Sequence, residues 1–388
     1  MSRAEKAILI FLACIAAVLV VMVIGAALPL LQLALAWQAP LGPALALPTQ
    51  TSTYTAPASA PTWTLTREPT SEQPKATPAN TPEPSPTPTP IISCGGPPVM
   101  TILAIGSDQR SDSYLYGLAD VIRIVRVDFI ARRATILEFP RDLWVEIPDI
   151  AEEEGITHEK LNQAYLYGNK GYGDYAGAGE GPGLLALTLE LNFGVRPDNY
   201  VAVNMQTFVR IVDAVGGINV NLPQNVDGRS EDSRRASLYF AAGDHHLDGQ
   251  AALTLARVRP VGVFERAATQ NLVLCALKEK LSSPSVLPRI PEIMASFQGA
   301  VQTDLSPEQI SQLACLGTKM QSENIVFASF PEELFEGRRV YDPVFKKNVF
   351  IWDVDFNVLR DYAARFNAGV WPSALPIAGG EKEAAFCP

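Results

Sequence analysis

Histidine is scarce in this sequence, which has only His158, His245 and His246 among its 388 residues. This scarcity disfavours a histidine-rich zinc site, and we interpret the adjacent pair His245-His246 as a polar turn before a helix, because metal ligands need wider spacing. Basic residues are outnumbered, with 31 Lys and Arg against 41 Asp and Glu and a net charge of −10. A general nucleic-acid-binding protein needs a surface that neutralises phosphates, so this balance argues against that class.

Charge is missing from a long stretch near the start of the chain. No charged residue lies between Lys6 and Arg67, and residues 7–37 are almost wholly apolar. About 20 apolar residues suffice to cross a bilayer. Arg3 and Lys6 precede the run and nothing basic follows closely, so the positive-inside rule places the N-terminus in the cytoplasm. A cleaved signal peptide is the alternative, but the run is too long for a usual signal core. We expect residues 1–38 to be a cytoplasmic stub and a single-pass signal anchor in the cell membrane.

Proline dominates the next stretch. Fifteen of the 31 prolines lie between Pro40 and Pro98, among many Thr, Ser and Ala. Segments such as TPEPSPTPTP at 81–90 favour polyproline II, because they can neither pair as strands nor bury a core. Such a segment acts as a semi-rigid spacer of about 3.1 Å per residue. We expect residues 39–98 to be an extracytoplasmic linker.

Four of the five cysteines follow the apolar run: Cys94, Cys275, Cys315 and Cys387. An oxidising compartment permits disulfides, and four cysteines allow three pairings. Cys275 and Cys315 both fall in helical patterns, whereas Cys94 and Cys387 bracket the folded region. We expect these two pairs to form structural disulfides.

Residues 99–370 are predicted to form one α/β domain, followed by a C-terminal tail at 371–388. Three short apolar runs, at 99–105, 121–127 and 134–139, predict strands. The short connection between the last two predicts a hairpin, in which the start of one strand lies beside the end of the other. Asp120, Arg141 and Asp142 should then meet at one sheet edge, and the loop at 108–120 should bring Asp108 there too.

Further elements alternate along the chain. The pattern predicts helices at 184–191, 208–215, 248–256 and 269–281, a helix starting at 306, and strands at 200–204, 218–222 and 324–330. Such alternation favours a three-layer α/β/α sandwich around a central mixed sheet.

A group of basic residues follows one of the predicted helices. Arg257 and Arg259 leave its end together, and Arg266 and Gln270 lie one turn apart on the next helix. Solvated or salt-bridged side chains are one explanation. An anionic ligand is the other, because guanidinium groups match phosphate oxygens bidentately, and Mg²⁺ favours one or two carboxylates with phosphate oxygens. Aspartates with arginines, and no zinc ligand set, suggest phosphate chemistry, although no P-loop or glycine-rich cradle is present.

Several motifs in this region resemble those of the LytR-CpsA-Psr family of bacterial cell-envelope proteins, in the family's order. They are ILAIGSDQR at 102–110, ADVI at 119–122, FPRDLWVEIP at 139–148, KLNQAY at 160–165, VDAVGGINV at 212–220, LDGQAAL at 247–253 and ARVR at 256–259. The resemblance spans about residues 99–281. The predicted anchor also looks like the family's.

The resemblance implies an α/β/α fold with a long apolar groove for a polyprenyl chain. It implies an enzyme that transfers a glycopolymer phosphate from a polyprenyl pyrophosphate to a peptidoglycan hydroxyl, with Mg²⁺ or Mn²⁺ bound. By motif position, the metal pair is Asp108 and Asp120, and these two with Arg141 are the catalytic residues. The pyrophosphate ligands on this basis are Arg110, Arg141, Lys160, Arg257, Arg259, Arg266 and Gln270.

Three positions depart from the family pattern. Leu118 stands where an arginine is common, Val263 replaces a usual aspartate and Thr269 a second arginine. We expect these changes to affect the acceptor or the efficiency of transfer more than pyrophosphate binding, and Arg110 offers a replacement charge for Leu118. The alternative functions are a polyprenyl-pyrophosphate phosphohydrolase and a non-catalytic lipid-binding or envelope-regulating module.

Overall fold

The computed structural model describes residues 40–48, 92–110, 114–150, 156–229, 235–258, 263–289, 293, 299–372 and 384–387. At the centre of the folded unit lies a seven-stranded sheet with the order β11-β6-β1-β2-β3-β12-β15. Its strands are β1 (Val99–Ser107), β2 (Ala119–Asp128), β3 (Arg133–Glu138), β6 (Asn199–Asn204), β11 (Val301–Thr303), β12 (Ile325–Ala328) and β15 (Ala384–Phe386). The pairs β1–β6 and β3–β12 are parallel and the other four are antiparallel, so the sheet is mixed, as predicted.

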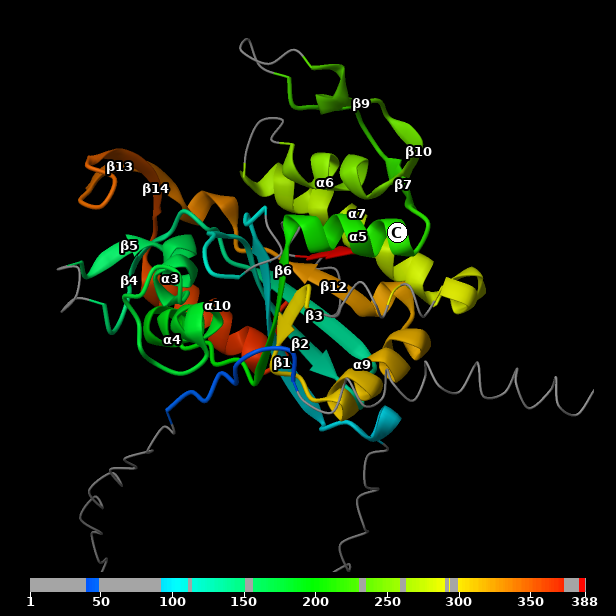
Figure 1. Ribbon diagram of the computed structural model, residues 1–388, viewed down its shortest axis with the longest axis horizontal. Coiled ribbons are helices and arrows are strands. Elements are labelled where there is room, and N and C mark those ends of the chain that lie inside the picture. Colours follow the sequence, from blue (N-terminus) through cyan, green and yellow to red (C-terminus); the bar gives the residue numbers. More distant parts are fainter. Residues whose placement is uncertain are drawn as a thin grey trace, which may run out of the picture. The chain divides into compact units, whose positions relative to one another are not determined.

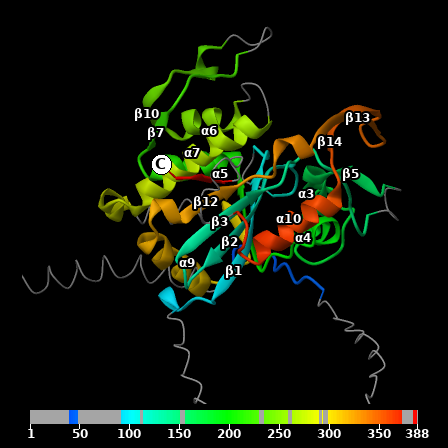
Figure 2. The same ribbon diagram turned by 180° about the vertical axis from the view of Figure 1, so that it is seen from behind.

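Both faces of this sheet are covered by helices, because apolar side chains alternate along its strands. Leu103 and Ile105 of β1 pack on one side with α3 (Leu161–Gly168), α4 (Glu180–Phe193) and α10 (Phe356–Asn367). Met100 and Ile102, on the opposite face of the same strand, pack on the other side with α9 (Pro307–Lys319). Figures 1 and 2 show these helices on opposite sides of the strands. The three-layer arrangement is therefore confirmed.

A further hydrophobic core lies among three helices and a hairpin. The elements are α5 (Met205–Ala214), α6 (Gly249–Arg257), α7 (Val263–Ser282), β7 (Ile218–Leu222) and β10 (Gly243–Leu247). β10 pairs antiparallel with β7, and it contains both His245 and His246. The prediction of a polar turn for the two histidines is therefore wrong, since their backbone forms a strand ladder.

The remaining pairs of strands are short ribbons outside the main sheet. They are β4 (Trp144–Glu146) with β5 (His158–Lys160), β8 (Val226–Asp227) with β9 (Tyr239–Phe240), and β13 (Glu336–Asp342) with β14 (Lys347–Asp353). Short 3₁₀-helices occur at Ser93–Gly95, Ala236–Leu238, Pro284–Arg289, Ser322–Asn324 and Glu332–Leu334. The sequence did not predict the β13–β14 hairpin, α3 or α10.

Side-chain caps fix the starts of three helices. Asp248 accepts a hydrogen bond from the Ala251 amide at the start of α6, at 2.7 Å. Ser306 and Gln309 form a reciprocal capping box at the start of α9. Asn204 caps α5 by accepting from the Thr207 amide at 2.8 Å. These caps satisfy amides that have no partner within the helix.

The disulfides join different partners from those predicted. Cys94 is bonded to Cys315, and Cys275 to Cys387. The predicted pairs are wrong because α9, which carries Cys315, packs against the 3₁₀ turn that contains Cys94, and Cys275 of α7 lies beside Cys387, which directly follows β15. The bonds therefore fasten both ends of the domain to its helical layer.

Part of the predicted linker packs on the domain. Leu45 is buried in the same core as α3 and α4, and its amide donates to Asp304 at 3.2 Å. The predicted signal anchor and the proline-rich stretch at 49–91 lie outside the described residues. Within the described part of the chain, no helix is both long and apolar enough to cross a membrane.

Candidate phosphate-binding site

The ends of three neighbouring strands meet at one edge of the central sheet. β1 and β2 are antiparallel, and a β-bulge between Gly106 and Ser107 lies opposite the start of β2, where Asp120 is the second residue. β2 and β3 are also antiparallel, so Arg141, just after β3, returns to the same edge. Asp108 follows the last residue of β1. The strand pairings therefore confirm the prediction that these segments converge at one edge of the sheet.

At this edge an alternating chain of charges connects four side chains. The Arg141 guanidinium forms a short ion pair with Asp120, and its Nε lies 3.3 Å from the Asp142 Oδ2 atom. Lys160, at the end of β5, places its Nζ 2.7 Å from the Asp142 Oδ1 atom. All four side chains are between 12% and 25% exposed, so the network is partly desolvated but open to a ligand. Partial desolvation strengthens each of these interactions relative to water.

The network shifts the pKa values of two of its members, Asp142 and Arg141. Burial alone would raise the pKa of Asp142, but the hydrogen bond and charge of Lys160 and the charge of Arg141 outweigh it and lower that pKa. Burial lowers the pKa of Arg141, but Asp120 and Asp142 more than offset this and raise it. Both groups are therefore charged at neutral pH, and Asp142 is a poor proton acceptor.

Asp108 is held by the loop that joins β1 to β2. Its Oδ1 accepts a hydrogen bond from the Leu118 amide at 2.7 Å, and its own amide donates to the Leu118 carbonyl at 3.0 Å. Gly117 makes this turn with φ +116°, and a Cβ there would lie 2.5 Å from the Ser107 Oγ. Leu118, which departs from the family pattern, thus binds Asp108 through its backbone N–H and C=O, which every residue type except proline supplies.

Helix α7 adds a guanidinium from the layer above the sheet. Arg266 is 5% exposed, and its Nη2 donates to the Asp120 carbonyl at 3.3 Å. This contact joins the α7 part of the predicted site to the strand edge. Arg266 and Arg141 therefore approach the same aspartate from two elements far apart in sequence.

Gln270 is also on α7, but its amide is engaged within the protein. Its Nε2 donates to the Ala256 carbonyl of α6 at 3.1 Å, and its Oε1 accepts from Arg123 at 3.1 Å. Gln270 thus links α6, α7 and β2 behind the charged network. A direct contact with pyrophosphate would require this amide to exchange partners.

Arg123 is a member of the site region that sequence reasoning missed. It is 3% exposed and lies on β2, where it also binds Glu138 at 2.6 Å and Asn271 at 2.8 Å. Arg123 and Glu138 are directly opposite each other on β2 and β3. An arginine inside an apolar strand pattern, with a glutamate at the end of the next strand, is a signal that could have indicated this pair.

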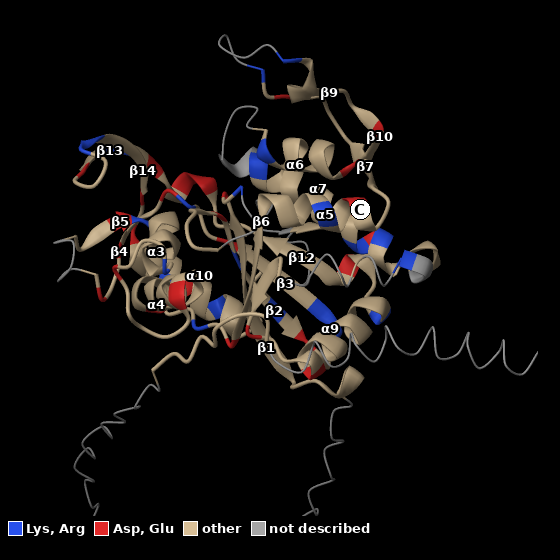
Figure 3. Cartoon of the chain, in the orientation of Figure 1, with Lys and Arg blue, Asp and Glu red and all other residues tan. Residues whose placement is uncertain are grey.

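Of the other predicted basic ligands, Arg257 and Arg110 are exposed to solvent, and the third lies outside the described chain. Arg257 is the exposed last residue of α6, and it directly follows Ala256, whose carbonyl accepts from Gln270. Figure 3 shows blue, the colour of Lys and Arg, at one end of α6. Arg110 is exposed two residues after Asp108. Arg259 lies outside the described residues.

The aspartates are suitable donors for a hard divalent cation. No group of three or more His, Cys, Asp and Glu side chains suited to a metal occurs in the described residues. Mg²⁺ does not need such a cage, since it retains water and uses phosphate oxygens with one or two carboxylates. Asp108 and Asp120 at one strand edge fit that requirement, with Asp120 shared with Arg141.

A sequence model described as the LytR_cpsA_psr family matches residues 80–355. The chain belongs to the LytR-CpsA-Psr family. Among the relatives, regulatory protein MsrR of Staphylococcus aureus (strain COL) is 27% identical over 217 residues, 55% of this chain and 58% of that protein. The polyisoprenyl-teichoic acid–peptidoglycan teichoic acid transferase TagU of Bacillus cereus (strain AH820) is 30% identical over 216 residues, 54% of this chain and 62% of that protein. The matched part is thus about three fifths of each curated relative's length.

The fold matches solved structures in the LytR-CpsA-Psr family. The crystal structure of TagV from B. subtilis aligns with a TM-score of 0.52 and 25% identity, and covers 71% of this chain and 98% of that one. The described LytR-CpsA-Psr domain therefore corresponds to nearly the whole of a solved relative.

Proposed function

We propose that this protein transfers a glycopolymer phosphate from a polyprenyl-pyrophosphate carrier to a hydroxyl of peptidoglycan, with Mg²⁺ or Mn²⁺ as cofactor. The observation that carries the proposal is the meeting of Arg141 and Arg266 on Asp120, at the edge that also holds Asp108. The teichoic acid transferase name of TagU supports the choice of donor and acceptor. The predicted anchor would keep this chemistry outside the cell and close to the membrane that holds the lipid carrier.

In the proposed reaction, an acceptor hydroxyl oxygen attacks the sugar-linked phosphorus. The bond from that phosphorus to the bridging oxygen breaks, and polyprenyl phosphate leaves with the bridging oxygen and the electron pair. When bound to Asp108 and Asp120, the divalent ion would neutralise phosphate charge. Arg141, Arg266 and the exposed Arg257 would position the two phosphates, since such catalysis is mainly positioning and electrostatic stabilisation.

The hydroxyl proton must pass to a base. The lowered pKa of Asp142 disfavours that carboxylate as the base. Asp108 and Asp120 are the remaining candidates at the edge. Lys160 then acts through Asp142, by keeping that carboxylate and Arg141 in place.

A transfer assay on the full chain in detergent tests the proposal. We expect Arg141→Ala and Asp108→Ala to lower the Mg²⁺-dependent transfer rate by roughly 100-fold or more, because each removes charge stabilisation at the phosphates. The matched control is Arg339→Ala, an exposed arginine on the β13–β14 hairpin, which should keep the full rate. Near-normal rates in both site variants would reject the site. Cleavage of the donor without acceptor would identify a phosphohydrolase, and tight donor binding without turnover a regulatory module.

A further inference from the structure

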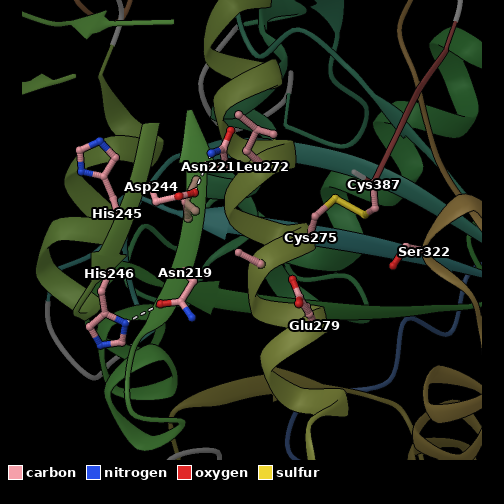
Figure 4. Close-up of a pocket in the computed structure, with 12 residues that line it drawn as sticks. Asn219, Asn221, Asp244, His245, His246, Leu272, Cys275, Glu279, Ser322 and Cys387 are labelled. Atoms are coloured by element: carbon pink, nitrogen blue, oxygen red, sulfur yellow. Dashed lines mark hydrogen bonds between the residues drawn. A yellow bond between two sulfur atoms is a disulfide. The ribbon is translucent and has the colours of Figure 1, made fainter. Parts of the chain in front are cut away.

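A hollow of about 570 Å³ lies along α7, beyond the turns that carry Arg266 and Gln270. Helix α7 crosses it between the β7–β10 hairpin and the Cys275–Cys387 disulfide, as Figure 4 shows. The hollow is wide enough for a small organic ligand. Nothing in the proposed phosphate chemistry uses it.

One wall of this hollow is a row of paired polar side chains. Asn219 and Asn221 alternate with Val220 on β7, so both amides lie on one face of the hairpin. Asn221 donates to Asp244 at 2.6 Å, and Asn219 pairs with His246 at 2.7 Å. Each partner lies directly opposite on β10. These bonds hold the side chains in fixed orientations before any ligand arrives, and Figure 4 shows the Asn219 amide nitrogen turned towards α7.

The base of the hollow is apolar. Leu272 and Ala276 of α7 lie one turn apart beside the Cys275–Cys387 disulfide, and Ala276 is buried. A sugar ring presents hydroxyl groups at its edge and an apolar C–H face. Paired amides beside a small apolar surface complement both parts of such a ring.

The charges of the lining select against phosphate. Asp244 and Glu279 are its acidic residues, and the described lining includes no lysine or arginine. Two carboxylates repel an anionic polymer at short range. The hollow therefore differs in its electrostatics from the strand edge, where three guanidinium or ammonium groups gather around Asp120 and Asp142.

We propose that this hollow binds an uncharged, hydroxyl-rich saccharide segment, such as a stretch of the acceptor glycan strand. This inference rests on the proposed function for its choice of glycan. Arg266 and Glu279 are thirteen residues apart on one helix, so about 20 Å separates their positions along the helix axis. A glycan segment held at the hollow would raise the local concentration of acceptor near the phosphate site without contacting the reacting atoms.

Chitotetraose, an uncharged oligosaccharide of N-acetylglucosamine, is a direct probe of the hollow. We expect saturable binding to the full chain by calorimetry, and binding about tenfold weaker in the double variant Asn219→Val, Asn221→Val, which loses two amides. Valine suits an exposed strand position, so the hairpin should still form. Gln224→Ala, an exposed residue beyond β7 that does not line the hollow, is the matched control. No saturable binding, or equal affinity in the double variant, would overturn the proposal.

A phosphate-bearing teichoic acid oligomer provides the opposing arm of the experiment. If the hollow binds the donor polymer instead, this oligomer should bind Glu279→Gln more tightly than the unaltered chain and lose affinity in the double valine variant. That result would contradict an uncharged ligand. We expect that neither Glu279→Gln nor the double valine variant changes the affinity for this oligomer.

The saccharide proposal and the phosphate proposal can fail separately. The double valine variant should keep the normal transfer rate at a saturating concentration of acceptor, because the hollow does not contact the reacting atoms, and Arg141→Ala should bind chitotetraose normally. Chitotetraose binding by a chain without transferase activity would reject only the proposed function. Normal transfer without chitotetraose binding would reject only the saccharide site.

Discussion

At the scale of single residues, one buried arginine organises the region behind the proposed site. Arg123 contacts Glu138, Gln270 and Asn271, and so joins two strands to α7. A buried charge needs several such partners, because its desolvation cost is high. Arg123 therefore supports the position of α7, which carries Arg266 to Asp120.

Removing that arginine should destabilise the fold strongly. We expect Arg123→Met to lower the free energy of unfolding by about 3 kcal/mol, because Glu138 is left as a largely buried and unpaired carboxylate. Urea denaturation would measure the loss. The second substitution Glu138→Gln should restore part of it. Equal losses with and without that second substitution would contradict the ion pair as the cause.

Glu159 on β5 is a second residue whose environment has a measurable consequence. It is fully buried, and burial together with the neighbouring Asp342 raises its pKa to about 7, from a usual value of 4.5. Gln163 of α3 opposes this shift, and Tyr167 of the same helix also lies close to the carboxyl group. Folding therefore favours the protonated form of Glu159.

The sign of the resulting pH dependence follows from linkage. Between about pH 4.5 and pH 7 the folded chain holds a proton that the unfolded chain has lost, so the Glu159 contribution to stability falls as the pH rises. As the pH rises, ionisation of Glu159 lowers the free energy of unfolding by an amount on the order of 2 kcal/mol, and we expect Glu159→Gln to remove this loss. Urea denaturation of both proteins near pH 5 and near pH 8 measures it. A stability difference between the two proteins that is independent of pH would contradict the raised pKa.

At the scale of elements, the start of α6 allows a helix cap to be tested against a control substitution on the same helix. Asp248 caps this helix, whose other end carries Ala256 and Arg257. We expect Asp248→Ala to lower the free energy of unfolding by about 1 kcal/mol. Gln250→Ala, an exposed position on the same helix, should change it little. Thermal denaturation of both variants would distinguish a capping effect from a general effect of alanine.

The elements also show where sequence patterns succeed. The strands at 99–107, 119–128 and 133–138 and the helix beginning after Asp248 follow from apolar runs and cap residues. The proximity of Asp120 and Arg141 also follows from the sequence, because a short connection predicts a hairpin that brings the start of β2 beside the end of β3. The β13–β14 hairpin was missed because its residues are mostly exposed, and exposure leaves no apolar alternation to recognise.

At the scale of the whole molecule, two disulfides secure the ends of the domain to its helices. Mass spectrometry of a non-reduced digest should find Cys94 linked to Cys315 and Cys275 linked to Cys387. The expected loss of unfolding free energy for Cys94→Ser with Cys315→Ser is about 2–5 kcal/mol, since the bond closes a long loop. Peptides linking Cys275 to Cys315 would contradict the structure.

The sequence by itself determined most of the central strands, the helices α4, α5, α6, α7 and α9, and the family of this protein, together with the strand edge where Asp108, Asp120 and Arg141 gather. These features depend on local periodicity, short connections and motif order, all of which are properties of neighbouring residues. The tertiary structure decided the disulfide partners, the engagement of Gln270 within the core and the role of Arg123. Those features depend on how α6, α7 and α9 approach the sheet, and that approach is set by packing between segments more than a hundred residues apart.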